Sequence, residues 1–378
     1  MQMSIKCSRC EAVIDDTALD GFCARCLLAD LVAPNYAAEA ESQTPPRDLK
    51  VLRYFGDYEF IEELSRGGMG TVFKARQVSL NRFVAVKIIE GRGSLNSKSL
   101  QKRFRVEAEA AARLQHPNIV PIYEFGEYGG EYFLSMKLIE NARSIVELRR
   151  SPRQVVSLLI KIAQAVHYAH QHGVLHRDIN PGNILVGADD VPYLTDFGLA
   201  KLTDGSANLT RTREALGTPA YMAPEQVRGS PQSLTTAVDI YAFGATLYEC
   251  LTSRPPFEAH SIPELLRKIL EEEPAPILRR STNNRALDGQ DRTAPGPIDH
   301  DLETICLKCL DKDADRRYAS AAAVAEDLEL WRQGKPISAR PVTTFERIGK
   351  WARRKPASAA LLVTASLAMT TIVIGGFW

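Results

Sequence analysis

Two neighbouring stretches decide the fold of this chain: VLHRDINPGNILV at residues 174–186 and PYLTDFGLAK at residues 192–201. Each stretch combines short apolar runs, which are typical of strands, with a polar loop. Asp178, Asn183 and Asp196 stand on those loops. Carboxylate and amide oxygens suit Mg²⁺, which proteins usually share with the phosphates of a substrate. The loops therefore predict a phosphate-handling site, in which Asp178 is placed to accept a proton from a hydroxyl group.

A glycine-rich turn lies further upstream, inside YEFIEELSRGGMGTVFKARQ at residues 58–77. The segments on either side of the turn read as strands, and NRFVAVKIIE at residues 81–90 reads as a third strand. In a dinucleotide-binding fold a helix would follow the glycines, whereas here the alternating segment TVFKAR follows Gly70. We therefore expect a hairpin flap whose backbone amides cover phosphate groups.

A lysine inside the third predicted strand is the expected cationic partner of those phosphates. Lys87 has apolar neighbours, so we expect its side chain to point into a cleft. The segment at residues 99–117 predicts a helix that carries Glu107, and we expect Glu107 to hold Lys87 by an ion pair. Two more strands are expected between residues 116 and 139, and a long apolar helix is expected at residues 151–173.

Together these motifs resemble the eukaryotic-like serine/threonine protein kinases of bacteria, over about Tyr58 to Trp331. Glu225 lies in an Ala-Pro-Glu triplet, and Arg317 resembles the arginine that pairs with it. Asp239 looks like the buried aspartate of a helix in the larger lobe, and Met136 falls at the gatekeeper position. The matching motifs, in chain order, are Gly67–Val72, Val84–Lys87, Glu107, His176–Asp178 with Asn183, Asp196–Gly198, Gly217–Met222 and Ala223–Glu225.

The resemblance implies transfer of the ATP γ-phosphate to Ser or Thr hydroxyls of protein substrates, with Mg²⁺ or Mn²⁺ bound beside the phosphates. The implied catalytic residues are Asp178, which orients the hydroxyl, Lys87, which binds the α- and β-phosphates and is held by Glu107, and Asn183 and Asp196, which hold the metal. The implied ATP-contacting residues are Leu64, Ser65, Arg66, Gly67, Gly68, Met69, Gly70, Thr71, Val72 and Lys87.

Two positions depart from the family pattern. Ser65 stands where the first glycine of the loop is usual, and serine adopts positive φ less readily than glycine. Asn180 stands where these kinases usually carry a lysine that contacts the γ-phosphate. Without compensation, the lost charge weakens transition-state stabilisation by about 2–4 kcal/mol. Tyrosine-kinase-like sequences also lack that lysine and remain active, so we expect an active kinase; the alternative is an ATP-binding, pseudokinase-like scaffold with weak catalysis.

The resemblance also implies control through phosphorylation of the loop between Asp196 and Glu225. Arg177, immediately before the catalytic aspartate, is the family's mark of such control. A phosphate on Thr210 or Thr212 is expected to pair with Arg177 and to order the loop. We expect the chain to autophosphorylate in trans, which requires self-association.

The composition is that of a folded protein, but it hides a charge gradient. Hydrophobic residues make up 45% and charged residues 25% of the 378 residues, which excludes a disordered or collagen-like chain. The net charge of +1 combines unlike parts, since residues 1–50 carry −3 and residues 333–356 carry +6. The acidic N-terminal segment argues against a nucleic-acid partner, and none is expected.

Four cysteines near the N-terminus form the pattern C-x2-C-x12-C-x2-C, namely Cys7, Cys10, Cys23 and Cys26. In a cytoplasmic segment thiolates are available to a metal, and two such pairs can close a tetrahedral site around Zn²⁺. A segment this short needs the metal in order to fold. We therefore expect a zinc-ribbon-like clip that serves protein interaction or dimerisation, with four unrelated cysteines as the alternative. Cys306 and Cys309 form a third C-x2-C, but their amphipathic surroundings predict core packing.

The last 22 residues carry no charge and read ASAALLVTASLAMTTIVIGGFW, residues 357–378. As a helix this segment would be about 33 Å long, enough to cross a hydrocarbon core of about 30 Å. Lys350, Arg353, Arg354 and Lys355 precede it, so the positive-inside rule places the upstream chain in the cytoplasm. We expect a single-pass protein of the cell membrane whose basic segment contacts anionic lipid. An amphipathic or buried helix is the alternative.

The expected fold class is α+β, a bilobal protein-kinase fold with a small β-rich N-terminal lobe and a larger helical C-terminal lobe. A small four-cysteine metal clip and one transmembrane helix are expected in addition. The expected parts are a four-cysteine segment at residues 1–28, a linker at 29–57, a kinase domain at 58–332, a basic juxtamembrane segment at 333–356 and a transmembrane helix at 357–378.

Overall fold

The computed structural model describes residues 5–6, 13–14, 51–67, 70–89, 98–148, 150–197, 218–229, 235–277 and 299–339. The chain forms two compact units, Met1–Val51 and Leu52–Trp378. In the first unit, strands β1 (Ile5–Lys6) and β2 (Val13–Ile14) pair antiparallel. The other described helices and strands belong to the second unit.

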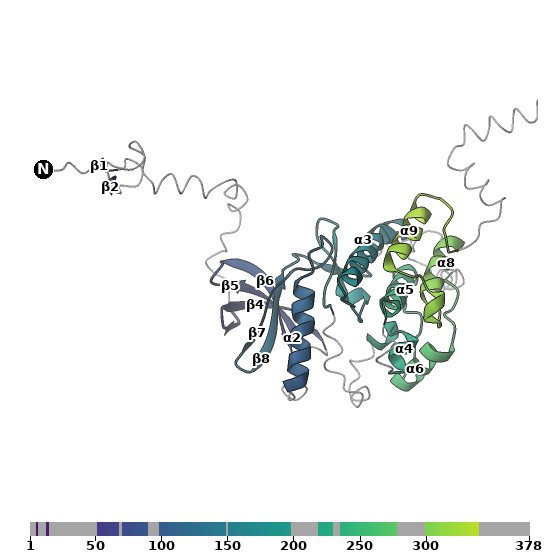
Figure 1. Ribbon diagram of the computed structural model, residues 1–378, viewed down its shortest axis with the longest axis horizontal. Helices are drawn as coiled ribbons and strands as arrows, with labels where there is room; N and C mark the ends of the chain where they lie inside the picture. The colour runs from purple at the N-terminus through teal and green to yellow at the C-terminus, as the bar shows by residue number, and fades with distance from the viewer. Residues whose placement is uncertain are drawn as a thin grey trace, which may run out of the picture. The chain divides into compact units, whose positions relative to one another are not determined.

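The smaller lobe of the second unit is an antiparallel sheet with the strand order β3-β4-β5-β6-β8-β7. Its strands are β3 (Arg53–Phe55), β4 (Tyr58–Gly67), β5 (Gly70–Gln77), β6 (Arg82–Ile89), β7 (Ile122–Tyr128) and β8 (Glu131–Lys137). In Figure 1 this sheet lies beside helix α2 (Lys98–Ala112), and the later helices, coloured teal to yellow, form a separate group. The second unit is therefore bilobal, with a sheet in one lobe and helices in the other.

Strand β6 divides its side chains between the two faces of the sheet. Val84 and Val86 join a buried cluster that is built on aromatic rings of β3, β4 and β8. Ala85 and Ile89 join a second cluster on the opposite face. Because successive side chains of a strand alternate between faces, Lys87 lies on the second face.

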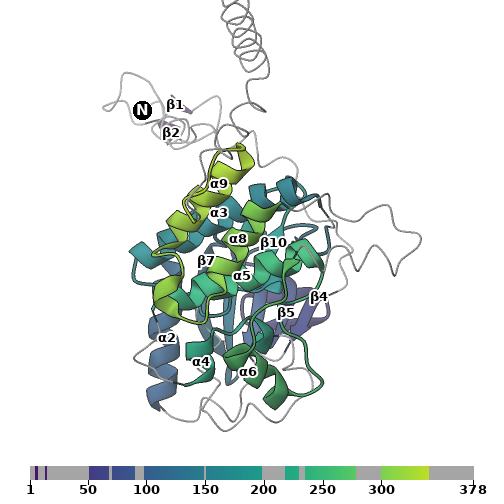
Figure 2. The same cartoon turned by 90° about the vertical axis from the view of Figure 1, so that its right-hand side faces the viewer.

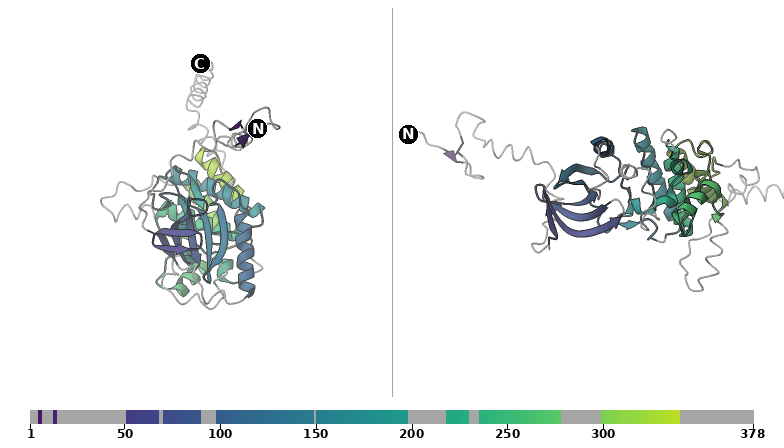
Figure 3. Two further views of the ribbon diagram at one scale, coloured as in Figure 1. Left: turned by 90° about the vertical axis from the view of Figure 1, so that its left-hand side faces the viewer. Right: turned by 90° about the horizontal axis from the view of Figure 1, so that it is seen from below.

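Helix α2 packs against the cluster on this second face, and the left-hand view of Figure 3 shows the helix beside the sheet. Ala108 belongs to the second cluster, and Ala111 belongs to the core of the larger lobe. The outward residues Arg105 and Val106 are exposed, and Glu107 is half-buried. Helix α2 therefore contacts both lobes through small side chains.

The larger lobe is a group of helices, which Figure 2 shows from the side. Their side chains pack into one extensive buried cluster. Its main helices are α3 (Pro152–Gln171), α5 (Ala237–Thr252), α8 (His300–Cys309) and α9 (Ala321–Arg332), with α4 (Pro224–Val227) and α6 (Ile262–Glu271) beside them. Helix α5 is buried along nearly its whole length, as expected for a helix that other helices surround. Cys306 and Cys309 of α8 are fully buried in this cluster, which confirms the predicted core packing.

The two stretches that decide the fold lie where the lobes meet. They form strands β10 (Ile184–Val186) and β11 (Pro192–Leu194), which pair with each other and, through β10, with β9 (Arg143–Ser144). The N–H of Val120, just before β7, donates to the carbonyl of Leu194, and the N–H of Leu194 donates to the carbonyl of Asn118, both at 2.9 Å. The loops after these strands are thereby fixed next to the sheet of the smaller lobe.

The folded unit extends beyond its predicted boundaries at both ends. Strand β3 lies inside the predicted linker 29–57 and pairs with β4. After α9, Ile337 is buried, and the carboxylate of Asp327 accepts the N–H groups of Ser338 and Ala339 at 2.7 and 2.9 Å. Sequence reasoning missed both extensions because neither leaves a periodic pattern of apolar residues. One is a short edge strand, and the other is a tail whose backbone N–H groups bond to the carboxylate of Asp327.

Several predicted features lie outside the described residues. They are Cys7, Cys10, Cys23 and Cys26, the glycine-loop residues Gly68 and Met69, the motif residues Gly198 and Gly217, the threonines Thr210 and Thr212, residues 340–356 of the basic segment, and the uncharged segment at residues 357–378. Within the described ranges, no helix is long and apolar enough to cross a membrane. The same ranges contain no group of three or more His, Cys, Asp or Glu side chains that is arranged to hold a metal ion.

Candidate active site

Lys87 extends from β6 into the junction between the lobes. Its strand neighbours are Val72 of β5 and Leu134 of β8, and only 6% of its surface is exposed. A buried ammonium group is costly unless an opposite charge lies beside it. The Nζ atom lies 2.9 Å from Oδ1 of Asp196, which supplies that charge. The side chain of Lys87 therefore reaches from the sheet of the smaller lobe to the segment that carries Asp196.

The glycine-rich turn is a β-hairpin, as predicted. Strands β4 and β5 pair up to Gly67 and Gly70, and Ser65 of the predicted nucleotide flap lies opposite Val72. Gly70 has a φ of +140°, and a Cβ atom there would lie 1.9 Å from the carbonyl oxygen of Ile88. A side chain at position 70 would therefore collide with β6, so the close approach of the two strands requires glycine.

The catalytic loop predicted from His176–Asp178 is held from behind by a buried aspartate of α5. The carboxylate of Asp239 accepts the N–H groups of His176 and Arg177 at 2.8 and 2.6 Å. His170 Nε2 lies 2.7 Å from the same carboxylate. Arg177 has a φ of +65°, an uncommon value for a residue other than glycine, and the two hydrogen bonds hold the loop in that conformation.

Asp178, the predicted catalytic aspartate, projects from this loop and is 8% exposed. Asn183 donates from Nδ2 to its Oδ2 at 3.1 Å and to its carbonyl oxygen at 2.8 Å. Burial raises the pKa of the Asp178 carboxyl, the nearby Asp196 raises it further, and His176 and the amide of Asn183 act in the opposite direction. Asp178 and Asn183, which were predicted as separate functional residues, are thus direct neighbours.

Asn180 is turned into the loop that it belongs to. Its Oδ1 accepts the N–H of Gly182 at 2.9 Å, and its Nδ2 donates to the carbonyl oxygen of Asp178 at 3.1 Å. Asn180 is therefore the N-cap of the short 3-10 helix η1 (Pro181–Asn183), a position where asparagine is favoured. The residue that replaces the family's lysine stabilises the loop by hydrogen bonds and brings no positive charge.

The predicted ion pair between Lys87 and Glu107 is not formed. Glu107 of α2 instead contacts Arg177, with 3.0 Å between Oε1 and Nη1, and Lys87 contacts Asp196. Sequence spacing could not reveal this arrangement, because Glu107 is carried by a helix that touches both lobes. Each of the four charged groups has one oppositely charged partner, but a different partner from the one expected.

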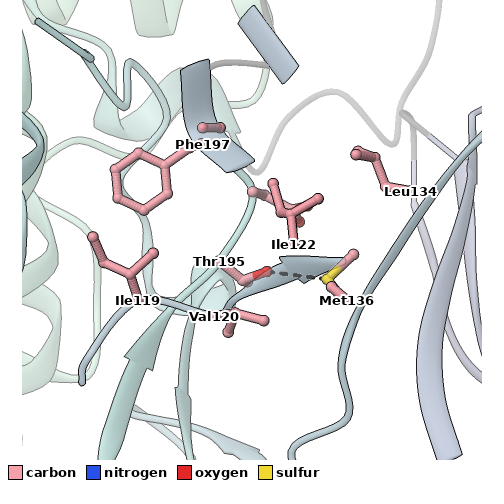
Figure 4. Close-up of a pocket in the computed structure, with 9 residues that line it drawn as sticks. Ile119, Val120, Ile122, Leu134, Met136, Thr195 and Phe197 are labelled. Carbon is pink, nitrogen blue, oxygen red and sulfur yellow. Dashed lines mark hydrogen bonds between the residues drawn. The ribbon is translucent and has the colours of Figure 1, made fainter. Parts of the chain in front are cut away.

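A small pocket lies between α2, the strands of the smaller lobe and the segment around Asp196 (Figure 4). Its lining residues are Ala111, Ile119, Val120, Ile122, Leu134, Met136, Thr195, Asp196 and Phe197. The Thr195 hydroxyl donates to the sulfur of Met136 at 3.7 Å, the contact dashed in Figure 4. Phe197 is buried, with its ring centroid 4.6 Å from that of His176. Met136, the predicted gatekeeper, therefore forms part of an apolar wall next to Asp196.

The predicted pair between Arg317 and Glu225 is present and fully formed. Two parallel contacts, of 2.7 and 2.9 Å, join the guanidinium group to the carboxylate. The arginine also donates to the carbonyl oxygens of Asp311 and Ala237, both at 2.8 Å. This arrangement confirms the resemblance at a pair of residues outside the phosphate-handling loops.

Two residues that support the site were missed from the sequence. Gln226 of α4 donates from Nε2 to the carbonyl oxygen of Arg177 at 3.1 Å. The carbonyl oxygen of Thr195 lies 2.8 Å from Nε2 of His176. Gln226 directly follows the Ala-Pro-Glu triplet, and Thr195 directly precedes Asp196. This position next to a motif is the sequence signal that could have identified both residues.

Asn183 and Asp196 fit the magnesium-binding role expected of them. They present only oxygen donors to a cation, namely an amide oxygen and a carboxylate, which is the donor set that Mg²⁺ prefers. The side chain of Asp196 is 20% exposed, so it is reachable from the junction. The N–H of Thr195 donates to the carbonyl oxygen of Asn183 at 3.0 Å, which holds the two segments side by side.

Comparison with known families supports the resemblance to protein kinases. The protein kinase domain family matches residues 58–328. Curated relatives include serine/threonine-protein kinase PknD of Mycobacterium tuberculosis, 37% identical over 276 residues, and PknB of Mycobacterium leprae, 35% identical over 295 residues. These alignments cover 72% and 76% of this chain but 39% and 45% of the relatives. The chain thus spans less than half the length of the curated relatives it matches.

Among solved structures, the kinase domain of Mycobacterium tuberculosis PknI resembles this chain with a TM-score of 0.56. The match covers 75% of this chain and 98% of that one, at 21% sequence identity. At this low sequence identity, the structural similarity is evidence for a shared fold alone.

Proposed function

This chain belongs to the protein kinase family, among the serine/threonine protein kinases, and we propose that it transfers the γ-phosphate of ATP to Ser or Thr hydroxyls of protein substrates. One observation carries the proposal: four of the predicted functional side chains form two contacting pairs at the junction of the lobes. Lys87 contacts Asp196 at 2.9 Å, and Asn183 contacts Asp178 at 3.1 Å.

In the proposed reaction, Asp178 orients the hydroxyl group of the substrate and accepts its proton. Asn183 fixes the carboxylate of Asp178, so little reorganisation is needed before the hydroxyl attacks. Burial raises the pKa of this carboxyl, which makes it a stronger base than an exposed aspartate. ATP with Mg²⁺ or Mn²⁺ supplies the phosphoryl group and a cation that neutralises its charge.

The remaining residues bind and position the nucleotide. Lys87 binds the α- and β-phosphates, Glu107 orients Lys87, and Asn183 and Asp196 hold the metal. The flap from Leu64 to Val72 covers the phosphates with its backbone amides. This assignment requires Lys87 to leave Asp196 when the nucleotide binds, because the two side chains are paired with each other in the structure.

Phosphate transfer tests the proposal directly. The full chain is incubated with labelled ATP, Mg²⁺ or Mn²⁺ and a generic protein substrate, and compared with Asp178→Ala. We expect the substitution to reduce the rate by about 100-fold or more, since it removes the catalytic base. Arg332→Ala, which removes an exposed arginine of α9, is the matched control and is expected to keep the wild-type rate. Equal rates for wild type and Asp178→Ala would contradict the proposal.

A pseudokinase-like scaffold is the second candidate function, and the position of Asn180 favours it. Both polar atoms of the Asn180 amide are engaged inside the loop, so this side chain offers no charge to a γ-phosphate. A scaffold binds ATP but transfers no phosphate. Saturable binding of an ATP analogue, together with no transfer above the Asp178→Ala background, would select this second function.

The proposal includes phosphorylation of one copy of the chain by another. Arg177 directly precedes the catalytic aspartate, and Thr210 and Thr212 follow in the segment before Glu225. A reaction between two copies makes the initial autophosphorylation rate rise with the square of protein concentration. Mass spectrometry then locates the phosphate, expected on Thr210 or Thr212. A rate proportional to concentration, or phosphate only elsewhere, contradicts this part of the proposal.

We also propose that the N-terminal cysteines bind Zn²⁺, on the strength of their spacing. Cys7 and Cys10 fall in the sequence between β1 and β2, which pair antiparallel, and hairpin connections commonly carry the ligand pairs of small zinc sites. Elemental analysis of the purified chain is expected to find one Zn²⁺ per chain. Cys7→Ser with Cys10→Ser is expected to lose it, whereas Cys306→Ser, which alters a buried thiol of α8, is expected to retain it.

Membrane anchoring through residues 357–378 is the last part of the proposal. The segment carries no charge, and the preceding residues 333–356 carry +6. We expect the full chain to sediment with membranes and to resist extraction by high salt, with the kinase domain open to protease on the cytoplasmic side only. A chain ending at residue 356 is expected to wash off in salt. Release of the full chain by salt alone would contradict a membrane span.

A further inference from the structure

The peptide group between Arg177 and Asp178 is held on both sides. The carbonyl oxygen of Arg177 accepts a hydrogen bond from Nε2 of Gln226 at 3.1 Å, and the N–H of Asp178 donates to Nδ1 of His176 at 3.3 Å. Because a peptide group is planar, these two contacts fix the plane that leads into the proposed catalytic aspartate. His176 belongs to the same loop, whereas Gln226 reaches it from α4.

His176 is in the right protonation state to accept its hydrogen bond. Its Nε2 lies 2.8 Å from the carbonyl oxygen of Thr195, so the proton is assigned to Nε2, and Nδ1 is the acceptor. The ring of His176 is fully buried, which holds it in this position. The nitrogen side of the peptide group is therefore held from within the loop, and the oxygen side depends on Gln226.

The peptide group before Asp178 follows a residue with an uncommon backbone conformation. Arg177 has a φ of +65°, in the left-handed region that residues with a Cβ atom seldom adopt. Asp239 holds the N–H of Arg177 at 2.6 Å, but that N–H belongs to the preceding peptide group. Rotation of the next peptide group would move the Asp178 carboxylate. Only contacts to that group itself, such as the one from Gln226, oppose the rotation.

Both polar atoms of the Gln226 amide are used, and their partners fix its orientation. Oε1 accepts the N–H of Ala223 at 2.9 Å, while Nε2 donates to the carbonyl oxygen of Arg177. A backbone N–H needs an acceptor and a backbone carbonyl needs a donor, so a reversed amide would lose both bonds. This one side chain therefore joins the backbone at Ala223 to the backbone at Arg177.

Helix α4 gives Gln226 a fixed base. The neighbouring Glu225 forms two contacts with Arg317, at 2.7 and 2.9 Å. Directly before α4 lies the 3-10 helix η4 (Thr218–Tyr221), part of the segment whose sequence resembles the substrate-facing segment of the family. Gln226 therefore ties the catalytic loop to the end of the segment that is expected to face the substrate.

We propose that Gln226 is a positioning residue, which fixes the peptide group before Asp178 relative to η4 and so sets where the Asp178 carboxylate meets the substrate hydroxyl. This proposal rests on the proposed kinase function, since it takes Asp178 as the group that orients the hydroxyl. It adds a residue outside the matched motifs, which end at Glu225. Gln226 acts through the backbone of Arg177.

Steady-state kinetics of Gln226→Met in the full chain test the proposal. Methionine has a similar length but no amide, so both bonds of Gln226 are lost. We expect kcat for a generic protein substrate to fall by about 10-fold or more, because a small displacement of a catalytic group slows the chemical step. The KM for ATP is expected to change by less than about twofold. An unchanged kcat, or a change in the KM for ATP alone, would overturn the proposal.

Gln154→Met is the matched control. Gln154 is the third residue of α3, and its Oε1 accepts the N–H of the N-cap residue Ser151 at 3.1 Å. Gln226 has the same relation to Ala223 in α4. The control thus loses the same kind of helix cap without losing a contact to the catalytic loop, and it is expected to keep the wild-type kcat. Equal falls in kcat for the two variants would contradict a specific role for Gln226.

Gln226→Glu separates the two bonds of the Gln226 amide. A carboxylate still accepts the N–H of Ala223, but it has no N–H to donate to Arg177. We expect kcat to fall as it does in Gln226→Met, and a wild-type kcat would show that the contact with Arg177 has no positioning role. Thermal unfolding checks that each variant is folded, and Gln226→Glu replaces Gln226→Met if the latter does not fold.

Hydrogen exchange supplies a readout that does not require phosphate transfer. We expect the backbone amides of residues 175–179 to exchange about threefold or more faster in Gln226→Met than in wild type, with no change in Gln154→Met. Unchanged exchange in Gln226→Met would overturn the proposal. If wild type transfers no more phosphate than Asp178→Ala, the proposed function fails, and the exchange rates still decide whether Gln226 holds the loop.

Discussion

Two arginine–glutamate pairs in this chain differ in almost every respect. Arg317 and Glu225 form two short contacts inside the larger lobe, with side-chain exposures of 0% and 9%. Arg177 and Glu107 form one contact across the junction of the lobes, with exposures of 27% and 30%, and each keeps a buried atom without a partner. The first pair was predicted from the sequence, and the second was not.

The difference shows which ion pairs a kinase sequence can predict. Arg317 and Glu225 are held by segments that pack on one helical core, so their family-like motifs are sufficient to bring them together. Glu107 belongs to α2, which contacts both lobes through alanines. Its partner depends on where the helix lies, and no local pattern encodes that position.

The largest expected effect on the free energy of unfolding comes from removing the buried pair between Arg317 and Glu225. Arg317→Met leaves the Glu225 carboxylate buried without a counter-charge, and we expect the free energy of unfolding to fall by about 3–5 kcal/mol. Urea unfolding measures the change. Arg267→Met, which removes an exposed arginine of α6 paired with Glu271 and Glu272, is the matched control and is expected to cost less than about 1 kcal/mol. Equal costs for the two variants would contradict the distinction between buried and exposed pairs.

A smaller effect on stability is expected from the loop that carries Asp178. Asn180→Ala removes the N-cap of η1, so we expect the free energy of unfolding to fall by about 1 kcal/mol and phosphate transfer to fall with it. Asn180→Ser keeps an oxygen that can accept the N–H of Gly182 and is expected to recover most of the stability. If alanine and serine behave alike, the cap has no role in holding Asp178.

The pair at the junction is expected to contribute still less to stability. Arg177→Gln removes a partly exposed single contact, and we expect the free energy of unfolding to change by less than about 1 kcal/mol. The same urea experiment provides the measurement. A loss as large as that of Arg317→Met would mean that the contact between Arg177 and Glu107 is a structural pair, in conflict with a Glu107 that leaves Arg177 to orient Lys87.

The smallest expected effect is a pH dependence of stability that comes from Lys312, near the pair between Arg317 and Glu225. Burial lowers the pKa of Lys312 to about 8, Glu273 acts in the opposite direction, and Arg317 lowers it further. Because the folded-state pKa lies below the ordinary value of 10.5, the unfolded chain holds more protons between these two pH values. Stability contributed by Lys312 therefore rises with pH across that window.

Comparison of wild type with Lys312→Met isolates this contribution. The stability of the variant relative to wild type is expected to fall as the pH is raised from about 8 to about 10.5, by less than about 1 kcal/mol. Urea unfolding at several pH values provides the measurement. A relative stability that is constant across this range would mean that Lys312 titrates normally in the folded chain.

Much of the fold and of the site was predictable because it depends on local patterns. The apolar neighbours of Lys87 were the basis for expecting a strand there, and the glycine-rich turn was expected to join two strands into a hairpin, as it does. The neighbouring loops that carry Asp178, Asn183 and Asp196 were also placed together. Each of these depends on a few consecutive residues and on strand pairing.

The parts that sequence reasoning missed depend on tertiary packing. Strand β3 is stabilised by pairing with β4, and the tail after α9 is held by the carboxylate of Asp327. Neither contact leaves a periodic signal. Asn180 was interpreted as a lost charge, whereas its hydrogen bonds give it a structural role that only the folded loop reveals.

The central claim is that Glu107 orients Lys87 when nucleotide is bound, so Glu107 changes partner while the pair between Arg317 and Glu225 stays fixed. The most direct measurement is a crystal structure of the full chain with a non-hydrolysable ATP analogue and Mg²⁺. We predict that a carboxylate oxygen of Glu107 lies within about 4 Å of the Lys87 Nζ atom, that Asp196 contacts the metal, and that the Arg317–Glu225 contacts are unchanged. Glu107 still paired with Arg177 in the presence of bound nucleotide and metal would contradict the account.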